Sequence, residues 1–302
     1  MVGYSIFAGT LADMTWPEVE AAGKRNAPLL IPIAVIEQHS RHLPLATDTY
    51  GAYLLCSLVQ RGLTQRGREA LIAPPYYFGV NATTSMFPGS LTVSPETMTG
   101  LLVEILENYA RWGLRRQFIV NHHGDPAHNR AIVDAILALR EKGVEATYFL
   151  GGMIAGFVDT AYRTAFHREL PLTGDAVLRA PESPATAEAL ARLTRSTGLD
   201  VHAGERETSL IMRWFPDTLA SDVNLAELRP VPKTAREFQE AEASGGWRAL
   251  SPWGHIGDPA VATPENGDLY AFEAADMTEA LDRFLAAREA STESVSTPAT
   301  PI

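Results

Sequence analysis

The stretch PLLIPIAVI at residues 28–36 decides the fold of this chain. It is short, apolar throughout and rich in β-branched side chains, which is typical of a strand buried on both faces of a sheet. Pro32 within it indicates an edge position or a bulge, because proline cannot donate to the strand ladder. Apolar residues then recur at helical spacing over residues 49–63. The sequence therefore predicts a strand followed by a helix.

Strand-like and helix-like segments keep alternating beyond this point. Strands are predicted at 70–74, 117–120 and 146–150, and helices at 95–112 and 127–139. The first of these helices is opened by SPET at 94–97, a typical capping pattern. Alternation at these lengths implies βαβ units, because parallel neighbours need a crossover helix. The expected fold class is α/β, with a mostly parallel central sheet covered by helices on both faces.

The pattern loosens in the second half of the chain. Residues 170–184 are rich in Pro and Gly and are predicted to form a long loop or lid, and residues 244–267 to be irregular. The last fourteen residues, EASTESVSTPATPI at 289–302, are polar and are predicted to be disordered. We find no internal repeat, so the expectation is a single domain over residues 1–288 and a disordered tail.

Composition excludes several classes of protein. The 302 residues carry 25 Lys and Arg against 36 Asp and Glu, a formal net charge of −11, which argues against nucleic acid as the main partner. No apolar run approaches about 18 residues and no signal segment opens the chain, so neither a membrane span nor secretion is expected. The single Cys56 excludes an intramolecular disulfide framework and a multi-cysteine zinc site. A cytoplasmic protein that acts on a small molecule fits these limits.

The first cluster of reactive side chains follows directly after the first predicted strand, in EQHSRHLPLATD at 37–48. Ligand sites of open α/β sheets gather at the carboxyl ends of the strands. Glu37 and His39 are two residues apart and point the same way if the chain stays extended, while Asp48 returns at the start of the next helix. Together with His42, they make a carboxylate and imidazole set that suits Zn²⁺, Mn²⁺ or Fe²⁺. The alternative is a polar strand end with Asp48 as a helix cap.

The second cluster, NHHGDPAHN at 121–129, also lies between a predicted strand and a helix. It should therefore face the same edge of the sheet as the first cluster. It contains His122, His123, Asp125 and His128. His128 falls inside the following helix and is interpreted as solvated or structural.

The third cluster is HAGERETS at 202–209. His202 and Glu207 beside a metal site suit proton transfer, because a hydrolase must deliver a proton to its leaving nitrogen. The alternative is a helix start, where acidic residues favour the positive end of the helix dipole. Glu205 and Arg206 are assigned to that alternative.

Taken together, the three clusters resemble the creatininase (creatinine amidohydrolase) superfamily. The matching pattern is E-x-H with an Asp eleven residues beyond the Glu, then N-x-H-G, then HAG-x-x-ETS. FPGSLTVSPET at 87–97 is similar to the FPGT signature of that superfamily, and GDPAVATPENG at 257–267 to its usual ending. The resemblance covers residues 15–284. It implies a three-layer α/β/α sandwich and assembly into homohexamers.

The resemblance also implies a role for each matching residue. Two divalent cations are expected, Zn²⁺ or Mn²⁺ with Fe²⁺ as a further option, and Asp48 would bridge them. Glu37 and His123 would be ligands of one cation and His39 a ligand of the other, and Asp125 stands at the place of the fifth ligand. The catalytic histidine would be His202, with Glu207 as its partner carboxylate.

The sequence departs from the superfamily pattern at positions that border the expected pocket. Asn81 and Thr84 stand where a Ser and a His are usual, and Ser40 and His122 each replace a Gly. Pro126 replaces an Asn. These departures predict a substrate other than that of the common members, with creatinine itself not expected. Candidates for an aromatic pocket wall are Trp214, Trp247 and Trp253.

The leading hypothesis is a dinuclear metal hydrolase that cleaves a C–N bond in an amide, cyclic amide or formamide rather than a peptide. Water held between the cations would be the nucleophile, and His202 with Glu207 would move the proton. One alternative is an enzyme of the same superfamily acting on a polyol- or sugar-derived ketone or lactone. Another is a metal-binding protein without catalysis.

Overall fold

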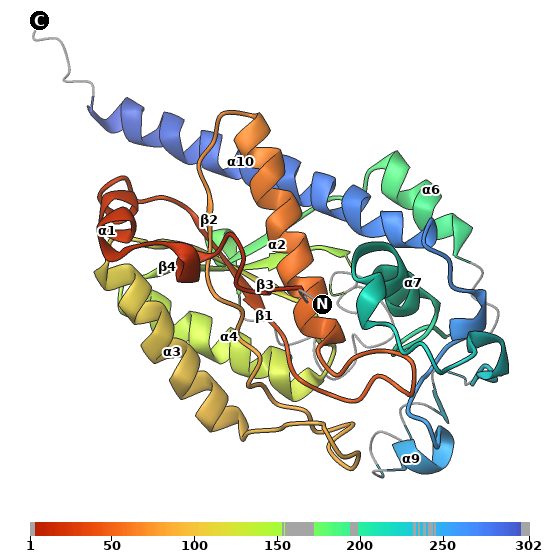
Figure 1. Ribbon diagram of the computed structural model, residues 1–302. Coiled ribbons are helices and arrows are strands. Elements are labelled where there is room, and N and C mark those ends of the chain that lie inside the picture. Colours follow the sequence, from red (N-terminus) through yellow and green to blue (C-terminus); the bar gives the residue numbers. More distant parts are fainter. Residues whose placement is uncertain are drawn as a thin grey trace, which may run out of the picture.

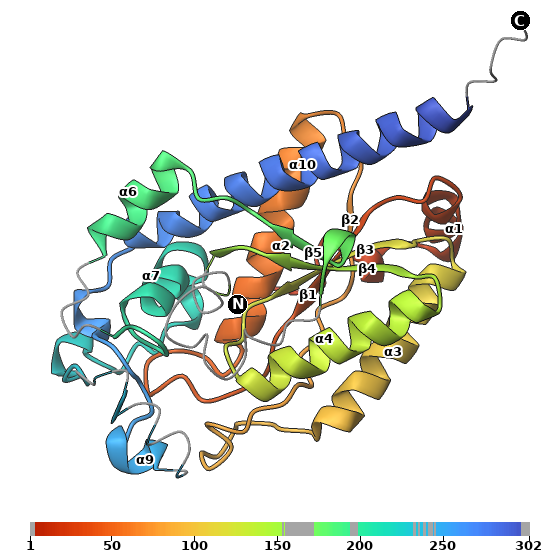
Figure 2. The same ribbon diagram turned by 180° about the vertical axis from the view of Figure 1, so that it is seen from behind.

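Five parallel strands form the central sheet of the computed structural model, in the order β2-β1-β3-β4-β5. The sheet lies between helices in Figures 1 and 2. The model describes residues 4–152, 154, 172–193, 199–231, 234, 236–237, 240, 244 and 246–296. The strands are β1 (Leu29–Ile33), β2 (Leu71–Ile72), β3 (Arg116–Asn121), β4 (Glu145–Leu150) and β5 (Val177–Arg179). Strand β1 therefore lies inside the sheet, and the short β2 forms its edge.

Helices cover both faces of the sheet (Figures 1 and 2). Alternate residues of β1 point to opposite faces, so Leu29, Ile31 and Ile33 belong to one apolar core and Leu30 to another. The first core is closed by α1 (Trp16–Lys24), α3 (Pro95–Arg111) and α4 (Pro126–Glu141). The second core is closed by α2 (Thr47–Gln65), α7 (Glu205–Trp214) and α10 (Leu269–Ser296). The predicted α/β fold with a parallel sheet between two helical layers is confirmed.

Shorter elements complete the described part of the chain. They are α6 (Pro184–Arg192), α9 (Trp247–Leu250), and 3-10 turns at Leu11–Asp13, Gly174–Ala176, Pro216–Thr218, Leu225–Glu227, Pro259–Val261 and Asn266–Asp268. Apart from α9 and two of these turns, the described residues of 244–267 are irregular, as predicted.

Capping residues set the starts of two helices that flank the sheet. Ser94 accepts a hydrogen bond from the backbone N–H of Thr97, as the SPET pattern predicts for α3. At α4, Asp125 Oδ1 accepts from the N–H groups of Ala127 and His128. Each cap satisfies N–H groups that have no partner within the helix. The start of α4 is thereby fixed directly beyond the end of β3.

The structure differs from the sequence-based expectation in two segments. Strand β5 lies within 170–184, which was predicted to be a loop; its three residues are too few for a clear alternating pattern. Residues 170 and 171 lie outside the described residues. Helix α10 runs to Ser296 and so extends into the segment 289–302 that was expected to be disordered. Residues 297–302 lie outside the described part.

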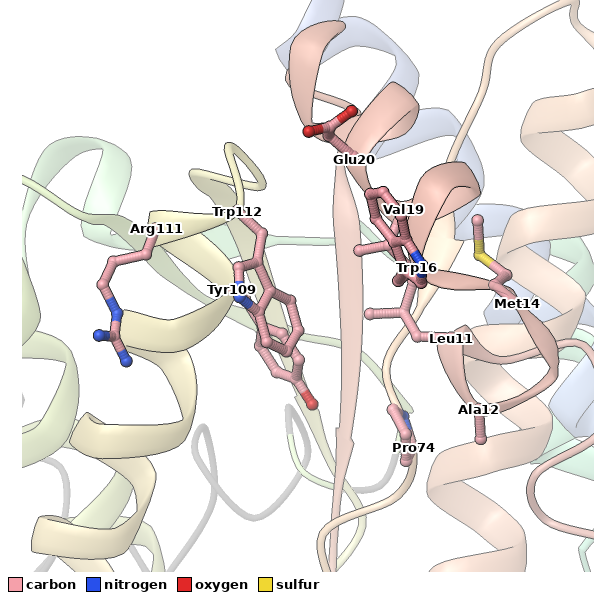
Figure 3. A pocket seen from close by; sticks show the side chains of 10 residues that line it. All are labelled: Leu11, Ala12, Met14, Trp16, Val19, Glu20, Pro74, Tyr109, Arg111 and Trp112. Carbon is pink, nitrogen blue, oxygen red and sulfur yellow. The ribbon is translucent and has the colours of Figure 1, made fainter.

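A mainly apolar cavity lies away from the polar strand ends. It has a volume of about 640 Å³ and is lined by α1 and the end of α3, with Met14, Trp16, Tyr109 and Trp112 among its walls (Figure 3). None of the reactive side chains of the three sequence clusters lines it. Among the described residues, no helix is both long and apolar enough to span a membrane.

Candidate metal centre

The carboxyl ends of β1 and β3 bring the first two clusters together. Glu37 follows β1, His123 follows β3, and Asp48 lies in the first turn of α2. The His123 Nδ1 atom is 3.0 Å from Glu37 Oε1 and 3.1 Å from Asp48 Oδ2. All three side chains are buried, and their donor atoms are close enough to one another to share one metal ion. They form the first of two ligand groups that share Asp48; a third possible group, Glu37, His39 and His202, does not include it.

His39 is the centre of the second ligand group. Its Nε2 atom is 3.4 Å from Asp48 Oδ1 and 3.7 Å from Glu207 Oε2. The side chain is fully buried, yet Nε2 has no hydrogen-bond partner. A buried nitrogen without a hydrogen-bond partner lowers the stability of the fold unless its lone pair binds another group, such as a cation. His39, Asp48 and Glu207 are close enough to hold a cation.

Asp48 belongs to both ligand groups through different oxygens. Its Oδ2 atom faces His123, whereas its Oδ1 atom faces His39. A carboxylate placed in this way can hold two cations side by side. Since the donors are imidazole nitrogens and carboxylate oxygens, the set suits Zn²⁺, Mn²⁺ or Fe²⁺. The residues present therefore fit a pair of divalent ions.

The imidazoles of His39, His123 and His202 are oriented by the same kind of contact. In each, one ring nitrogen faces a backbone carbonyl oxygen, which can only accept, so that nitrogen carries the proton in the neutral ring. The other nitrogen then turns its lone pair toward the carboxylates, as metal-ligating histidines commonly do. The pairs are His39 with Glu37 O at 3.1 Å, His123 with Val80 O at 3.2 Å, and His202 with Gln38 O at 2.6 Å.

The charges of the site shift the pKa values of its members. Burial opposes the charged form of His39, but the carboxylates of Asp48, Glu207 and Glu37 outweigh it and raise its pKa to about 10. Burial likewise opposes protonation of His123, yet Glu37 and Asp48 raise its pKa well above the ordinary value. The pKa of Asp48 lies well below its usual range, because His39 and the other imidazoles outweigh its burial. The site therefore favours bound positive charge, whether protons or cations.

His202 lies at the edge of the cluster, in an antiparallel bridge with Ile256. Its Nδ1 atom is 3.8 Å from Glu37 Oε1, and Trp247 packs edge-on against the ring with centroids 5.5 Å apart. With its Nε2 proton donated to Gln38 O, the ring presents an unprotonated Nδ1 to the cluster. The side-chain Nε2 of Gln38 also lies 3.0 Å from the same ring nitrogen, and sequence reasoning did not single out this residue.

Glu207 and Asp125 have different surroundings. Glu207 lies beside His39 and accepts a hydrogen bond from the N–H of Ala203. Asp125 caps α4, and its Oδ2 atom accepts from Ala82 N at 2.8 Å. Among the described residues, the groups close enough to share an ion include Glu207 but not Asp125.

The departures from the superfamily pattern lie around the ligand groups. The hydroxyl of Thr84 donates to Glu37 Oε2, and the Thr84 N–H donates to Asn81 Oδ1 at 3.2 Å. Pro126 is the first residue of α4. The ring of His122 lies 3.4 Å from Asp48 Oδ1. Thr84 and His122 thus touch carboxylates of the candidate site directly.

The remaining histidines and tryptophans have varied surroundings. His42 is buried and its Nε2 contacts Thr208 Oγ1 at 2.9 Å; burial, then the nearby imidazoles, lower its pKa to about 3. His128 is fully buried rather than solvated, and packs edge-on against His123. Trp214 donates to Gly267 O at 3.0 Å. Of the three tryptophans suggested as a pocket wall, Trp247 packs against the His202 ring, whereas Trp253 is 54% exposed and lies against Arg41.

Comparisons with known proteins show the family of this chain. The family model described as creatininase, creatinine amidohydrolase, matches residues 12–281. A mycofactocin precursor peptide peptidase from Mycolicibacterium smegmatis is 27% identical over 248 residues, which are 80% of this chain and 78% of that protein. A creatinine amidohydrolase from Pseudomonas putida is 26% identical over 226 residues, 72% of this chain and 75% of that protein.

Solved structures share the fold. The crystal structure of creatinine amidohydrolase (creatininase) superimposes with a TM-score of 0.64 at 22% identity, covering 91% of this chain and 97% of that one. A structure described as creatininase Mn has a TM-score of 0.61 at 20% identity, covering 91% and 98%. At these identities the likeness shows a common fold.

Proposed function

Because the chain belongs to the creatininase family of hydrolases, we propose that it uses two divalent cations to cleave an amide C–N bond in a small molecule or short peptide. The observation that carries the proposal is the position of Asp48. Its two buried oxygens face two different histidines, and each pair is completed by a further carboxylate. A protein that only packed these residues as a core would have no need for so many titratable groups in one place.

The proposed ligands follow from the two groups around Asp48. Glu37, His123 and one Asp48 oxygen would hold one cation, and His39, Glu207 and the other Asp48 oxygen would hold its neighbour. Glu207 thereby takes the place that the family resemblance assigned to Asp125. Two divalent cations, when bound, supply Lewis acidity toward the substrate carbonyl and toward the attacking water.

His202 is the proposed proton carrier. The carbonyl of Gln38 holds its Nε2–H and so keeps the Nδ1 lone pair directed at the cluster. From that position His202 can take a proton from the attacking water and return it to the leaving nitrogen, which cannot depart readily as an anion. Trp247 packs edge-on against the ring, which is buried.

The names of two relatives bear on the bond that is cleaved. One is a peptidase and the other a creatinine amidohydrolase, and both names describe attack on a C–N bond of an amide type. The sequence alone favoured a non-peptide amide. We extend the proposed substrates to short peptides because of the peptidase relative, whose alignment covers 80% of this chain.

The test is a hydrolysis screen with matched histidine variants. Protein loaded with Mn²⁺ or Zn²⁺ is assayed against cyclic amides, N-formyl amines and short peptides, with lactones and cyclic ketones as the comparison set. We expect turnover within the amide set, and a loss of about 10²- to 10⁴-fold in kcat for His202→Gln with unchanged metal content.

The control for that variant is His255→Gln. His255 is also buried, but its ring contacts Ser40 Oγ at 3.3 Å and Arg229 O at 2.8 Å, outside the ligand groups. This variant should keep most of the turnover. Hydrolysis confined to the lactone or ketone set would contradict the amide proposal, and loss of metal from His202→Gln would contradict the role of His202.

A further inference from the structure

A chain of buried polar side chains runs from Asp48 away from the ligand groups toward α10. We propose that His122, held by Tyr270, is a positioning residue that fixes the Asp48 carboxylate between the two cation sites. The inference rests on the proposed function, because it assigns a purpose to the residues behind the shared carboxylate. Neither the family resemblance nor the comparisons assign a role to His122 or Tyr270.

The geometry fixes the direction of the hydrogen bonds. The ring of His122 is 1% exposed, with Nδ1 at 3.4 Å from Asp48 Oδ1 and Nε2 at 3.1 Å from the Tyr270 hydroxyl. The ionised Asp48 can only accept, so Nδ1 carries the proton of the neutral ring. Nε2 must then accept, and the Tyr270 hydroxyl donates to it. Tyr270 thus selects the one tautomer of His122 that can donate to Asp48.

Tyr270 is itself held by a buried ion pair between two helices. The guanidinium of Arg206, on α7, lies 5.5 Å from the centroid of the Tyr270 ring. Arg206 also donates to the carboxylate of Glu273, which is 3% exposed and lies three residues after Tyr270 on α10. A buried pair of this kind is seldom retained for stability alone, since its desolvation cost is high. Here it locks the tyrosine that orients His122.

Two glycines make room for this arrangement. A Cβ atom on Gly51, in the second turn of α2, would lie 2.7 Å from the His122 ring. A Cβ atom on Gly152 would lie 2.6 Å from Glu273 Oε2. Both distances are far below van der Waals contact, so each position needs a residue without a side chain while these groups stay in place. The packing around His122 is fitted to an imidazole and not to a smaller residue.

Loss of the Tyr270 hydroxyl should weaken metal binding. In Tyr270→Phe the aromatic ring stays, but nothing selects the tautomer of His122, so Asp48 loses a fixed donor and gains freedom to rotate. Removal of an outer partner of a metal ligand commonly lowers metal affinity 10- to 100-fold. We expect a drop of about that size for the weaker of the two cations.

The experiment is a calorimetric titration of Mn²⁺ into the full chain after removal of metal by a chelator. Wild type is compared with Tyr270→Phe and with Tyr53→Phe as the matched control. The Tyr53 hydroxyl donates to Ala8 O at 2.7 Å and lies on the same helix as Asp48, but it contacts no member of the cluster. The control should bind Mn²⁺ like wild type.

A second pair of variants tests His122 directly. The side-chain amide of Asn can occupy the place of Nδ1, so His122→Asn keeps a donor for Asp48, whereas His122→Ala removes it. We expect Mn²⁺ affinity to decrease in the order wild type, His122→Asn, His122→Ala. Such rescue by a donor of the right position would not arise if His122 only filled space.

The outcomes separate this inference from the proposed function. If wild type binds two Mn²⁺ ions and hydrolyses an amide while Tyr270→Phe and both His122 variants bind Mn²⁺ as tightly as the control, the positioning role is overturned and the function stands. Equal losses in His122→Asn and His122→Ala would also overturn it. If wild type binds no Mn²⁺ or Zn²⁺, both proposals fall. Should Tyr270→Phe fail to fold, the His122 pair alone decides.

Discussion

Asp48 combines deep burial with full ionisation, a combination that needs several compensating contacts. It is 2% exposed at the start of a helix, where the backbone dipole favours negative charge. The imidazoles of His39, His122 and His123 surround its two oxygens. Burying one unpaired carboxylate at this depth would cost roughly several kcal/mol, because the ion loses its hydration. The site is thus a concentration of negative charge built to be neutralised.

The raised pKa values of the histidines predict how metal binding depends on pH. Without cations, His39 has a pKa of about 10 and is protonated at pH 7, so its proton must leave before its nitrogen can coordinate. Affinity for Zn²⁺ or Mn²⁺ should therefore rise as the pH is raised from 6 toward 9. Titration calorimetry in buffers of different ionisation enthalpy should show release of about one proton or more per chain. Heats that do not depend on the buffer would contradict this.

The same shift has a consequence for the metal-free protein. A group whose pKa is raised on folding stabilises the fold fully below its unfolded pKa, which for histidine is about 6.5, and that stabilisation fades as the pH rises to the folded value. For His39 the window runs from about 6.5 to about 10. The melting temperature of the metal-free chain should therefore fall across this window relative to that of the metal-loaded chain, which differential scanning calorimetry can follow.

Glu207 and Asp125 compete for one role, and conservative substitutions separate them. Glu207→Gln should lose one of two metal ions, because Glu207 is close to His39 and Asp48. Asp125→Asn should keep both ions and most of the stability, because asparagine also caps helices well. Elemental analysis of the two purified variants gives the answer. Loss of an ion from Asp125→Asn together with full loading of Glu207→Gln would restore the ligand set implied by the family resemblance.

At the scale of elements, the starts of α2, α4 and α7 surround the site. Each begins beside a ligand group: Asp48 is in the first turn of α2, Asp125 caps α4, and Glu207 is in the first turn of α7. The segment at 257–267 fixes α7 from outside, since Asn266 donates to Glu205 Oε1 at 2.9 Å. The carboxylates of the site therefore depend on the orientation of whole helices rather than of flexible loops.

Gly51 offers a test at this scale. Replacing glycine by alanine inside a helix usually stabilises a protein by about 0.5–1 kcal/mol. Gly100→Ala in α3 should do so, because a Cβ atom there meets nothing within 4 Å. Gly51→Ala should instead destabilise by about 1–3 kcal/mol through overpacking, and should weaken Mn²⁺ binding by displacing His122. Equal effects of the two variants on melting temperature and Mn²⁺ affinity would contradict this.

Local signals were enough to predict most of the elements that build the sheet. Apolar runs marked β1, β3 and β4, and the SPET cap marked the start of α3, because such signals are encoded by neighbouring residues. Strand β5 was missed because its three residues carry no period. Helix α10 was predicted to end too early, since polar residues at a chain end are compatible with either helix or disorder.

The site residues, too, could be predicted only where the signal lies in neighbouring residues. Motif spacing brought Glu37, His39, Asp48 and His123 into one set, and the structure places them together. The approach of Glu207 to His39 and the contact of Tyr270 with His122 depend on how α7 and α10 pack, which no local pattern records. The sequence marked His122 as a departure from the superfamily pattern. It did not indicate the partner of His122, because Tyr270 lies 148 residues further along the chain.

At the scale of the whole molecule, buried carboxylates and imidazoles gather at the carboxyl edge of the sheet. The chain carries a formal net charge of −11, and part of this excess is the buried carboxylates of Glu37, Asp48 and Glu207. Two divalent cations would make the loaded protein less negative by up to four charges, less any protons released. Two apolar cores hold the opposite faces of the sheet and leave its carboxyl edge to the polar groups.

The most direct test of the account is the number of metal ions bound per chain in wild type and in Asp48→Asn. Each protein is loaded with Mn²⁺ or Zn²⁺, freed of excess metal by gel filtration and analysed for metal content, with circular dichroism to verify the fold. Since Asp48 is shared by both ligand groups, we predict about two ions in wild type and fewer than one in folded Asp48→Asn. Wild type without metal, or Asp48→Asn with two ions, would contradict the dinuclear centre.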